Sequence, residues 1–452
     1  MAKADRDAVL RAQKRVPPPG GALLEDTEKM KQKHHRMLCA FCALVILVST
    51  VFPTAAFAEQ PVDAAAAEQT LTRADAAEMQ QADAAVTALT EGEQYQEMDT
   101  DARKDAALAQ LDTLAAKGLV EKDSIYTDEE NGMVSFRYPC GVLGGILLTE
   151  SEDETLDEEN AETETASNAL PLRLPPDLGA EMQKSRAALL RRTENQAVEK
   201  FGTAVIYYAF DNTINSSRFP YYSYMQGFWS ALGLETKINI HVTVADLKKM
   251  GNFNVSVLSA HGSYYTYSYG KFLKRTRTEP IMLLTEESTF GKDLRYGFDL
   301  LAHRVIKVNG MYCVTSDFFR NAYKGGKLSN TIVYSETCEF LGVDGSEDNA
   351  MADALLSGGA QAVIGYVNNV YTVYSRSMLW DTINHLIMGQ NVGQALEHAK
   401  ATYGEDDLIW YHAQGGRRPH AAASYAVLYG NSQAALHVPE SNRSMFSADL
   451  AA

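Results

Sequence analysis

The chain has 452 residues, 46% of them hydrophobic, and its 58 acidic and 41 basic side chains give a net charge of −17. That hydrophobic content is enough for a sizeable core. No basic cluster is interleaved with aromatic residues, so we expect no nucleic acid partner. The acidic excess lies in residues 59–164, which hold 27 acidic and 6 basic residues, and it says nothing about what the rest of the chain binds.

The first 58 residues have the order of a secretory signal. A basic cluster at 31–36 precedes an apolar run, Met37–Phe52, and small residues follow at Ala56 and Ala58. This order predicts a signal peptide cleaved after Ala58, a secreted or cell-surface protein, and membrane contact only through the signal. A retained membrane anchor is the alternative, although the apolar run is slightly short for a bilayer span.

Residues 59–149 form an acidic, alanine-rich N-terminal region and a candidate pro-region. We predict two amphipathic helices and two short strands in it: Ala74–Leu89, Ala102–Leu119, Ser135–Tyr138 and Val142–Leu148. Residues 150–178 are mostly acidic, small or proline residues, and we interpret them as a solvated linker. A helix is predicted to follow at 178–200.

From residue 203 onward, short apolar runs alternate with helical patterns. The predicted strands are Thr203–Phe210, Lys237–Val242, Val255–Ala260, Ile281–Leu284, Thr331–Ser335 and Ala360–Val367. The predicted helices are Tyr224–Leu234, Val244–Met250, Asp317–Tyr323, Asn349–Leu356, Met378–Met388 and Val392–Tyr403. This alternation predicts a mainly parallel sheet covered by helices on both faces. We assign 179–440 to one α/β domain and 441–452 to a tail.

Three cysteines remain after the predicted cleavage: Cys140, Cys313 and Cys338. An odd number in an exported protein leaves at least one thiol outside any disulfide. A Cys140–Cys313 pair would leave Cys338 as that thiol.

Two of the predicted strands lead directly into reactive residues. Val255–Ala260 runs into His261 and Gly262, and Thr331–Ser335 is followed closely by Cys338. The carboxyl ends of neighbouring parallel strands border one crevice, so an imidazole and a thiol there can face each other. That pair suits nucleophilic thiol catalysis, with the backbone N–H groups of Gly262 and Cys338 as an oxyanion hole. Taken singly, a cysteine or a histidine is more often structural.

The order of these segments resembles the caspase, gingipain, clostripain and legumain superfamily of cysteine peptidases. In that group an apolar strand and His-Gly precede an apolar strand and Cys, as they do at His261 and Cys338 here. The resemblance covers roughly 203–438 and implies a caspase-like α/β/α sandwich that hydrolyses peptide bonds in a peptide or protein substrate.

Further segments carry the same resemblance. Met351–Leu356 and Gly358–Tyr366 are similar to the helix and strand after the nucleophile in bacterial members, which often have Trp where this chain has Tyr366. Gly389–Leu396 and Leu428–Asn431 are similar to their closing helix and last strand.

The resemblance also implies which residues bind substrate. The residue two before the nucleophile, Glu336, would line the P1 pocket, where a carboxylate favours Arg or Lys by charge pairing. Legumain-like members also have Glu there and accept Asn, and a solvated or helix-capping acid is the alternative role. Asn368 and Asn369 stand where the substrate-binding loop of the family begins. An insertion at about 264–310 would form a substrate-side flap or a surface loop.

We therefore expect an exported cysteine endopeptidase, with Arg191, Arg192 and Lys274–Arg277 as self-processing sites if P1 is basic. A non-catalytic binding protein with the same fold and a thiol acyl transferase remain alternatives. The other histidines, including His385 and His398, show no metal-ligand spacing in the sequence, so we expect neither a metal nor another cofactor.

Overall fold

The computed structural model describes residues 70–148, 182, 184, 198–210, 220–270, 274–408, 410 and 423–446. All of them belong to the second of two compact units, Val62–Ala452. The predicted signal peptide, the linker at 150–178 and most of the predicted helix at 178–200 lie outside the described residues. Within the described part, no helix combines the length and apolar character that a membrane crossing needs.

The larger α/β layer is built on a six-stranded sheet with the order β15-β14-β11-β6-β4-β5. Its strands are β4 (Gly202–Ala209), β5 (Leu234–Asn239), β6 (Val255–Ala260), β11 (Ile332–Ser335), β14 (Ala362–Val367) and β15 (Tyr425–Gly430). All neighbouring pairs are parallel except β14 and β15, which are antiparallel. The predicted mainly parallel α/β sheet is therefore confirmed.

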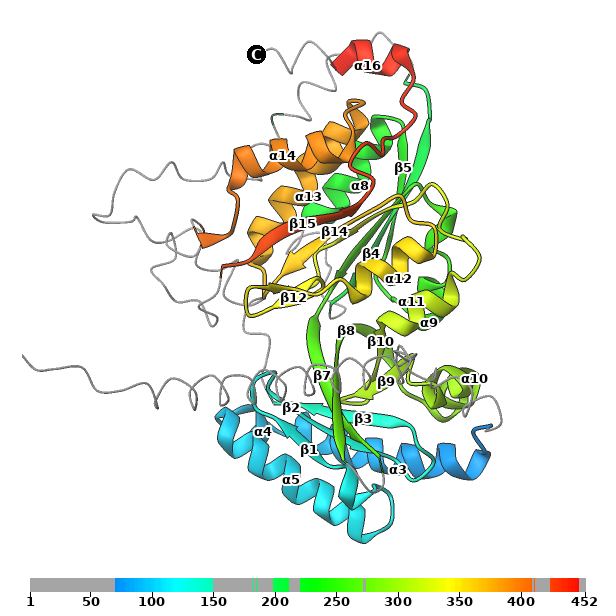
Figure 1. Ribbon diagram of the computed structural model, residues 1–452, viewed down its shortest axis with the longest axis vertical. Helices are drawn as coiled ribbons and strands as arrows, with labels where there is room; N and C mark the ends of the chain where they lie inside the picture. The colour runs from blue at the N-terminus through cyan, green and yellow to red at the C-terminus, as the bar shows by residue number, and fades with distance from the viewer. Residues whose placement is uncertain are drawn as a thin grey trace, which may run out of the picture. The chain divides into compact units, whose positions relative to one another are not determined.

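Helices cover both faces of this sheet (Figure 1). On one face, alternate strand residues pack with α8 (Pro220–Ala231), α13 (Thr372–Ile387) and α14 (Val392–Tyr403). On the other, they pack with α9 (Val244–Leu247), α11 (Ser316–Ala322) and α12 (Ala350–Ser357). Burial on both faces explains why β6, β11 and β14 are mostly apolar, with only small serine or glycine residues between their hydrophobic side chains.

A second, seven-stranded sheet joins two regions that are far apart in the sequence. Its order is β1-β2-β3-β9-β10-β8-β7, and only β3 and β9 pair in parallel. The strands are β1 (Tyr126–Asp128), β2 (Met133–Arg137), β3 (Leu143–Leu147), β7 (Gly262–Tyr269), β8 (Arg275–Glu287), β9 (Val305–Val308) and β10 (Met311–Thr315). A shared core packs this sheet with α3 (Arg73–Thr90), α5 (Thr100–Ala116) and α10 (Phe290–Leu301).

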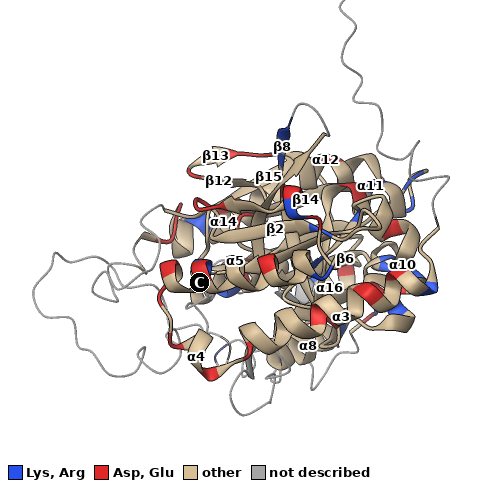
Figure 2. Ribbon diagram, turned by 90° about the horizontal axis from the view of Figure 1, so that it is seen from below, with Lys and Arg blue, Asp and Glu red and all other residues tan. Residues whose placement is uncertain are grey.

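The remaining elements are short. They are α4 (Glu93–Gln96), the 3-10 turns η1 (Lys122–Ser124) and η2 (Met250–Asn252), the small hairpin β12 (Gly342–Val343) and β13 (Ser346–Glu347), and α16 (Glu440–Phe446). Much of the acidic excess of the described residues lies in 70–148, which hold 15 acidic and 6 basic residues, and Figure 2 shows acidic positions on α3, α4 and α5.

A buried ionic cluster ties the N-terminal helices to the second sheet. Lys307 on β9 is 1% exposed and forms ion pairs with Asp83 on α3 and, at 3.0 Å, with Asp293 on α10. Tyr138 donates to Asp83, and Tyr312 donates to Asp293 at 2.8 Å. Buried charges of this kind need such partners because their desolvation is costly.

This sheet changes how the N-terminal region and the insertion are understood. The described residues of 264–310 are not a flap or a surface loop, because they form most of β7, all of β8 and α10, and β9. The strands β1–β3 extend the same sheet, so the boundary predicted between 59–149 and the α/β domain runs through one hydrogen-bonded structure. Removing 59–149 as a pro-region would expose the β9 edge.

Candidate active site

The register of the parallel sheet places His261 and Cys338 at the same height along their two neighbouring strands. Leu258 on β6 pairs with Ser335 on β11, and the Glu336 N–H extends this ladder by donating to the Leu258 carbonyl at 2.7 Å. Three further residues along each chain lead to His261 and Cys338. Neighbouring strands are only about 4.8 Å apart, so both residues lie at the carboxyl edge of adjacent central strands.

Gly262 contacts the cysteine backbone directly. A Cβ at this position would lie 2.1 Å from the Cys338 carbonyl oxygen and 2.5 Å from Thr337 Cγ2, a space that no side chain can occupy. The Leu283 N–H donates to the His261 carbonyl at 2.9 Å, and strand alternation then directs the Gly262 N–H away from β8. Position 262 must therefore be glycine, because the backbones of residues 262 and 338 meet there.

The two side chains differ from buried structural ones in their surroundings. His261 and Cys338 are both partly exposed. The Phe210 ring meets the imidazole edge-on, with the ring centroids 4.7 Å apart. The Val370 N–H donates to Cys338 Sγ at 3.4 Å, and the sulfur lies 3.9 Å from the Val370 carbonyl oxygen, to which a thiol can donate.

The other described cysteines are unsuited to nucleophilic attack. Burial raises the pKa of Cys140 to about 11 and raises that of the fully buried Cys313 further. Neither they nor Cys338 forms a disulfide among the described residues, so the Cys140–Cys313 bond considered from the sequence is absent. A raised pKa leaves few thiolates at neutral pH.

Glu336 lies next to the cysteine but is enclosed by the protein. Its side chain accepts hydrogen bonds from Tyr222 at 3.0 Å and from Ser375 at 3.4 Å, and the residue is 4% exposed. Burial raises the pKa of Glu336 to about 7, while the nearby Arg376 guanidinium and these hydroxyls oppose that shift. The carboxylate predicted to line an open P1 pocket therefore already has internal partners.

Asn368 holds several loops together at this edge. Its side-chain oxygen accepts from the Gly345 N–H at 2.9 Å, and its amide donates to the Ala423 carbonyl at 2.7 Å. Its backbone N–H donates to the Gly342 carbonyl, and its carbonyl accepts from the Glu339 N–H. Its φ of 67° is one that asparagine tolerates. The predicted substrate-binding Asn368 thus has its polar groups engaged in the fold, whereas the adjacent Asn369 is partly exposed.

Glu339 is a feature of the site that the sequence pattern did not indicate. It directly follows Cys338 and has a φ of 53°, which is uncommon for glutamate. Burial and the nearby Asp344 raise its pKa to about 7, and the backbone of Tyr264 on β7 opposes that shift. No local signal marks this conformation, because it depends on the packing of β7 against the loop after β11.

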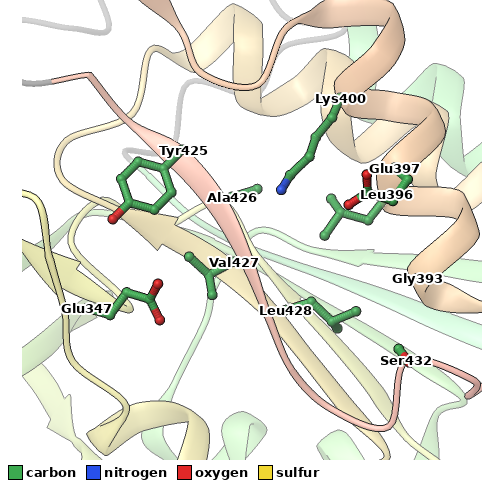
Figure 3. Close-up of a pocket in the computed structure, with 10 residues that line it drawn as sticks. All are labelled: Glu347, Gly393, Leu396, Glu397, Lys400, Tyr425, Ala426, Val427, Leu428 and Ser432. Carbon is green, nitrogen blue, oxygen red and sulfur yellow. The ribbon is translucent and has the colours of Figure 1, made fainter.

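A pocket of about 420 Å³ lies elsewhere, between α14 and the outer side of β15 (Figure 3). Leu396, Val427 and Leu428 form its apolar part, while Lys400 and Glu397 project from α14 beside it. It contains neither His261 nor Cys338 and offers no thiol or imidazole.

The fold and this edge together define a class: an α/β protein with a histidine and a cysteine at the carboxyl ends of neighbouring parallel strands. No protein-family model matches the chain. No curated protein matches it either.

Proposed function

We propose that this protein is an exported cysteine endopeptidase with a caspase-like fold, and that Cys338 is its nucleophile and His261 its acid–base. The observation that carries the proposal is the contact between Gly262 and the Cys338 carbonyl, which joins the two strand ends. The six-stranded sheet with helices on both faces is compatible with that fold. The order His before Cys along the chain agrees with the same superfamily.

The chemistry follows from these positions. The His261 imidazole takes the thiol proton, and the Cys338 sulfur attacks the carbonyl carbon of the scissile peptide bond. The N–H groups of Gly262 and Cys338 donate to the oxyanion that forms. His261 then gives the proton to the leaving amine, which departs and leaves an acyl-thioester. Water hydrolyses the thioester and regenerates the thiol.

Glu336 is the residue we propose to set a preference for a basic P1 side chain. Because Arg376 already offsets part of its charge, the preference depends on how far Glu336 is ionised. With its pKa raised to about 7, the carboxylate gains charge as pH rises from 6 to 8. Selection of Arg or Lys over Asn at P1 should strengthen over that interval.

Fluorogenic peptides with Arg, Lys, Asn or Asp at P1 test the activity. We expect hydrolysis by the wild type, none by Cys338→Ala, and wild-type rates for the matched control Cys140→Ala. An electrophilic acyl probe should label Cys338 alone, because burial raises the pKa of the other two described thiols. His261→Ala should suppress that labelling. Absence of both turnover and Cys338 labelling would refute the proposal.

A non-catalytic binding protein with the same fold is the second candidate. It is favoured by the internal hydrogen bonds of Glu336 and Asn368, which occupy groups that a substrate would need. It predicts that Cys338 reacts no faster than Cys140 near neutral pH. Labelling of Cys338 without hydrolysis of any of the four peptides would instead favour acyl transfer.

A further inference from the structure

Three potential metal ligands converge between α13 and α14, outside the candidate active site. Asp381 and His385 are four residues apart on α13, and His398 comes from α14. One ligand atom from each side chain lies within 4.8 Å of the other two. His398 Nδ1 is 2.7 Å from one Asp381 oxygen, and His385 Nε2 is 3.7 Å from the other.

The donor set and its surroundings suit a transition metal. Two imidazoles and one carboxylate match the preference of Zn²⁺ for nitrogen and oxygen ligands, with a fourth position left for water. The side chains of His385 and Asp381 are 5% and 15% exposed, whereas that of His398 is 46% exposed, so an ion can enter from the His398 side. The two rings lie only 3.7 Å apart, centroid to centroid.

A second observation concerns the other nitrogen of His385. Nδ1 of His385 and Oε1 of Gln390 are both shielded from solvent, and neither forms a hydrogen bond of ordinary length within the described part of the chain. When Nε2 ligates a metal, the ring proton must be on Nδ1, where Gln390 Oε1 can accept it. A metal on Nε2 would fix this tautomer and so favour the Nδ1–H donor that Gln390 can accept.

We propose that Asp381, His385 and His398 bind one divalent transition-metal ion, with Zn²⁺ as the best match, and that the ion links α13 to α14. The two helices pack closely against each other in the layer that covers the six-stranded sheet. Bonds from both helices to one ion stabilise that layer, because an ion that binds only the folded protein adds its binding free energy to folding. This inference does not depend on the proposed peptidase activity.

The test uses the full chain, stripped with a chelator and titrated with ZnCl2 by calorimetry. Metal content after buffer exchange gives the stoichiometry, and Co²⁺ serves as a spectroscopic probe of the ligand field. We expect one Zn²⁺ per chain and a higher thermal midpoint with Zn²⁺ than without it. His398→Ala and Asp381→Asn should each weaken binding by at least about 100-fold, more than loss of a second-sphere group typically costs.

Two further variants make the outcome decisive. Gln390→Ala should weaken binding by about 10–100-fold, as expected for the partner of a ligating histidine. His437→Ala, a matched change of an exposed histidine, should leave binding unaltered. His398→Ala removes a half-exposed side chain, so circular dichroism should confirm that it folds. Failure to bind one equivalent, or unchanged binding by folded His398→Ala, would overturn the proposal.

Discussion

Replacing Lys307 by methionine would test how the N-terminal helices are held to the rest of the protein. The change keeps the length of the side chain but removes the positive charge between Asp83 and Asp293, which are 6% and 0% exposed. Asp293 would keep neutral donors, Tyr312 at 2.8 Å and Gln80 at 2.9 Å. Asp83 would keep Tyr138 and Ser288.

The expected cost follows from leaving two buried carboxylates without this counter-charge. Breaking a buried ion pair by removing one partner typically lowers the free energy of unfolding by about 3–5 kcal/mol. The neutral donors offset part of the loss, so we expect about 3 kcal/mol. Lys200→Met is the matched control: its pair with Glu235 is exposed at the surface, and its loss should cost about 1 kcal/mol or less.

Urea unfolding followed by circular dichroism measures both variants, and amide hydrogen exchange in β3 and β9 shows where the structure opens. Lys307→Met should increase exchange in these two strands more than in β6 or β14. The double variant Lys307→Met/Asp293→Asn should recover part of the lost stability, because one unpaired charge is removed. A Lys307→Met protein as stable as Lys200→Met would refute the reasoning.

Two further predictions concern the candidate active site. Burial raises the pKa of Glu336 from its ordinary 4.5 to about 7. The folded state therefore binds the proton more tightly than the unfolded chain, and stability falls as the pH rises through this interval. Glu336→Gln should remove this decrease in the free energy of unfolding, which amounts to about 3 kcal/mol at most. Unfolding curves recorded between pH 4 and 8 measure it, and an unchanged dependence of the free energy of unfolding on pH would contradict the prediction. Gly262→Ala should lower kcat strongly and stability by about 1–3 kcal/mol, because its Cβ would clash with the Cys338 carbonyl. Gly227→Ala has open space around it and is the matched helix control, expected to be neutral or stabilising; equal behaviour of the two alanine variants would show that the contact is unimportant.

Hydrophobic runs predicted the parallel sheet well because its strands are buried on both faces. Val255–Ala260 and Val392–Tyr403 have the bounds predicted from the sequence. Elsewhere the predictions are displaced: β5 is Leu234–Asn239 rather than Lys237–Val242, and α8 begins at Pro220 rather than Tyr224. The boundary of an amphipathic segment depends on its neighbours as well as on its own pattern.

The seven-stranded sheet was largely missed because its pairing is not local. Tyr265, Tyr267 and Tyr269 alternate with small polar residues, which is a strand pattern, but the basic residues that follow suggested a surface loop. Nothing in the local sequence of β9 indicates that its partner is β3, more than 150 residues earlier. The pairing of β3 with β9 is seen only in the three-dimensional structure.

In the candidate site, too, the local sequence predicted some features, and contacts between distant segments determined the others. The strand-end pattern predicted His261 and Cys338, because their positions follow from the ends of two buried runs. The internal partners of Glu336 could not be predicted, since Tyr222 and Arg376 come from helices distant in sequence. The sequence predicted no metal site, because the histidines show no metal-ligand motif and an isolated Asp381-x-x-x-His385 pair did not indicate one. The third ligand, His398, required the packing of α13 on α14.

The pairing of β3 with β9 has a consequence for any cleavage between residues 148 and 198. A cut at Arg191 or Arg192, where self-processing is proposed, would sever the backbone but leave this pairing and the Lys307 cluster in place. The product would be a two-chain protein whose fragments elute together and separate only in denaturant. Processing there would nick the molecule without liberating its amino-terminal third.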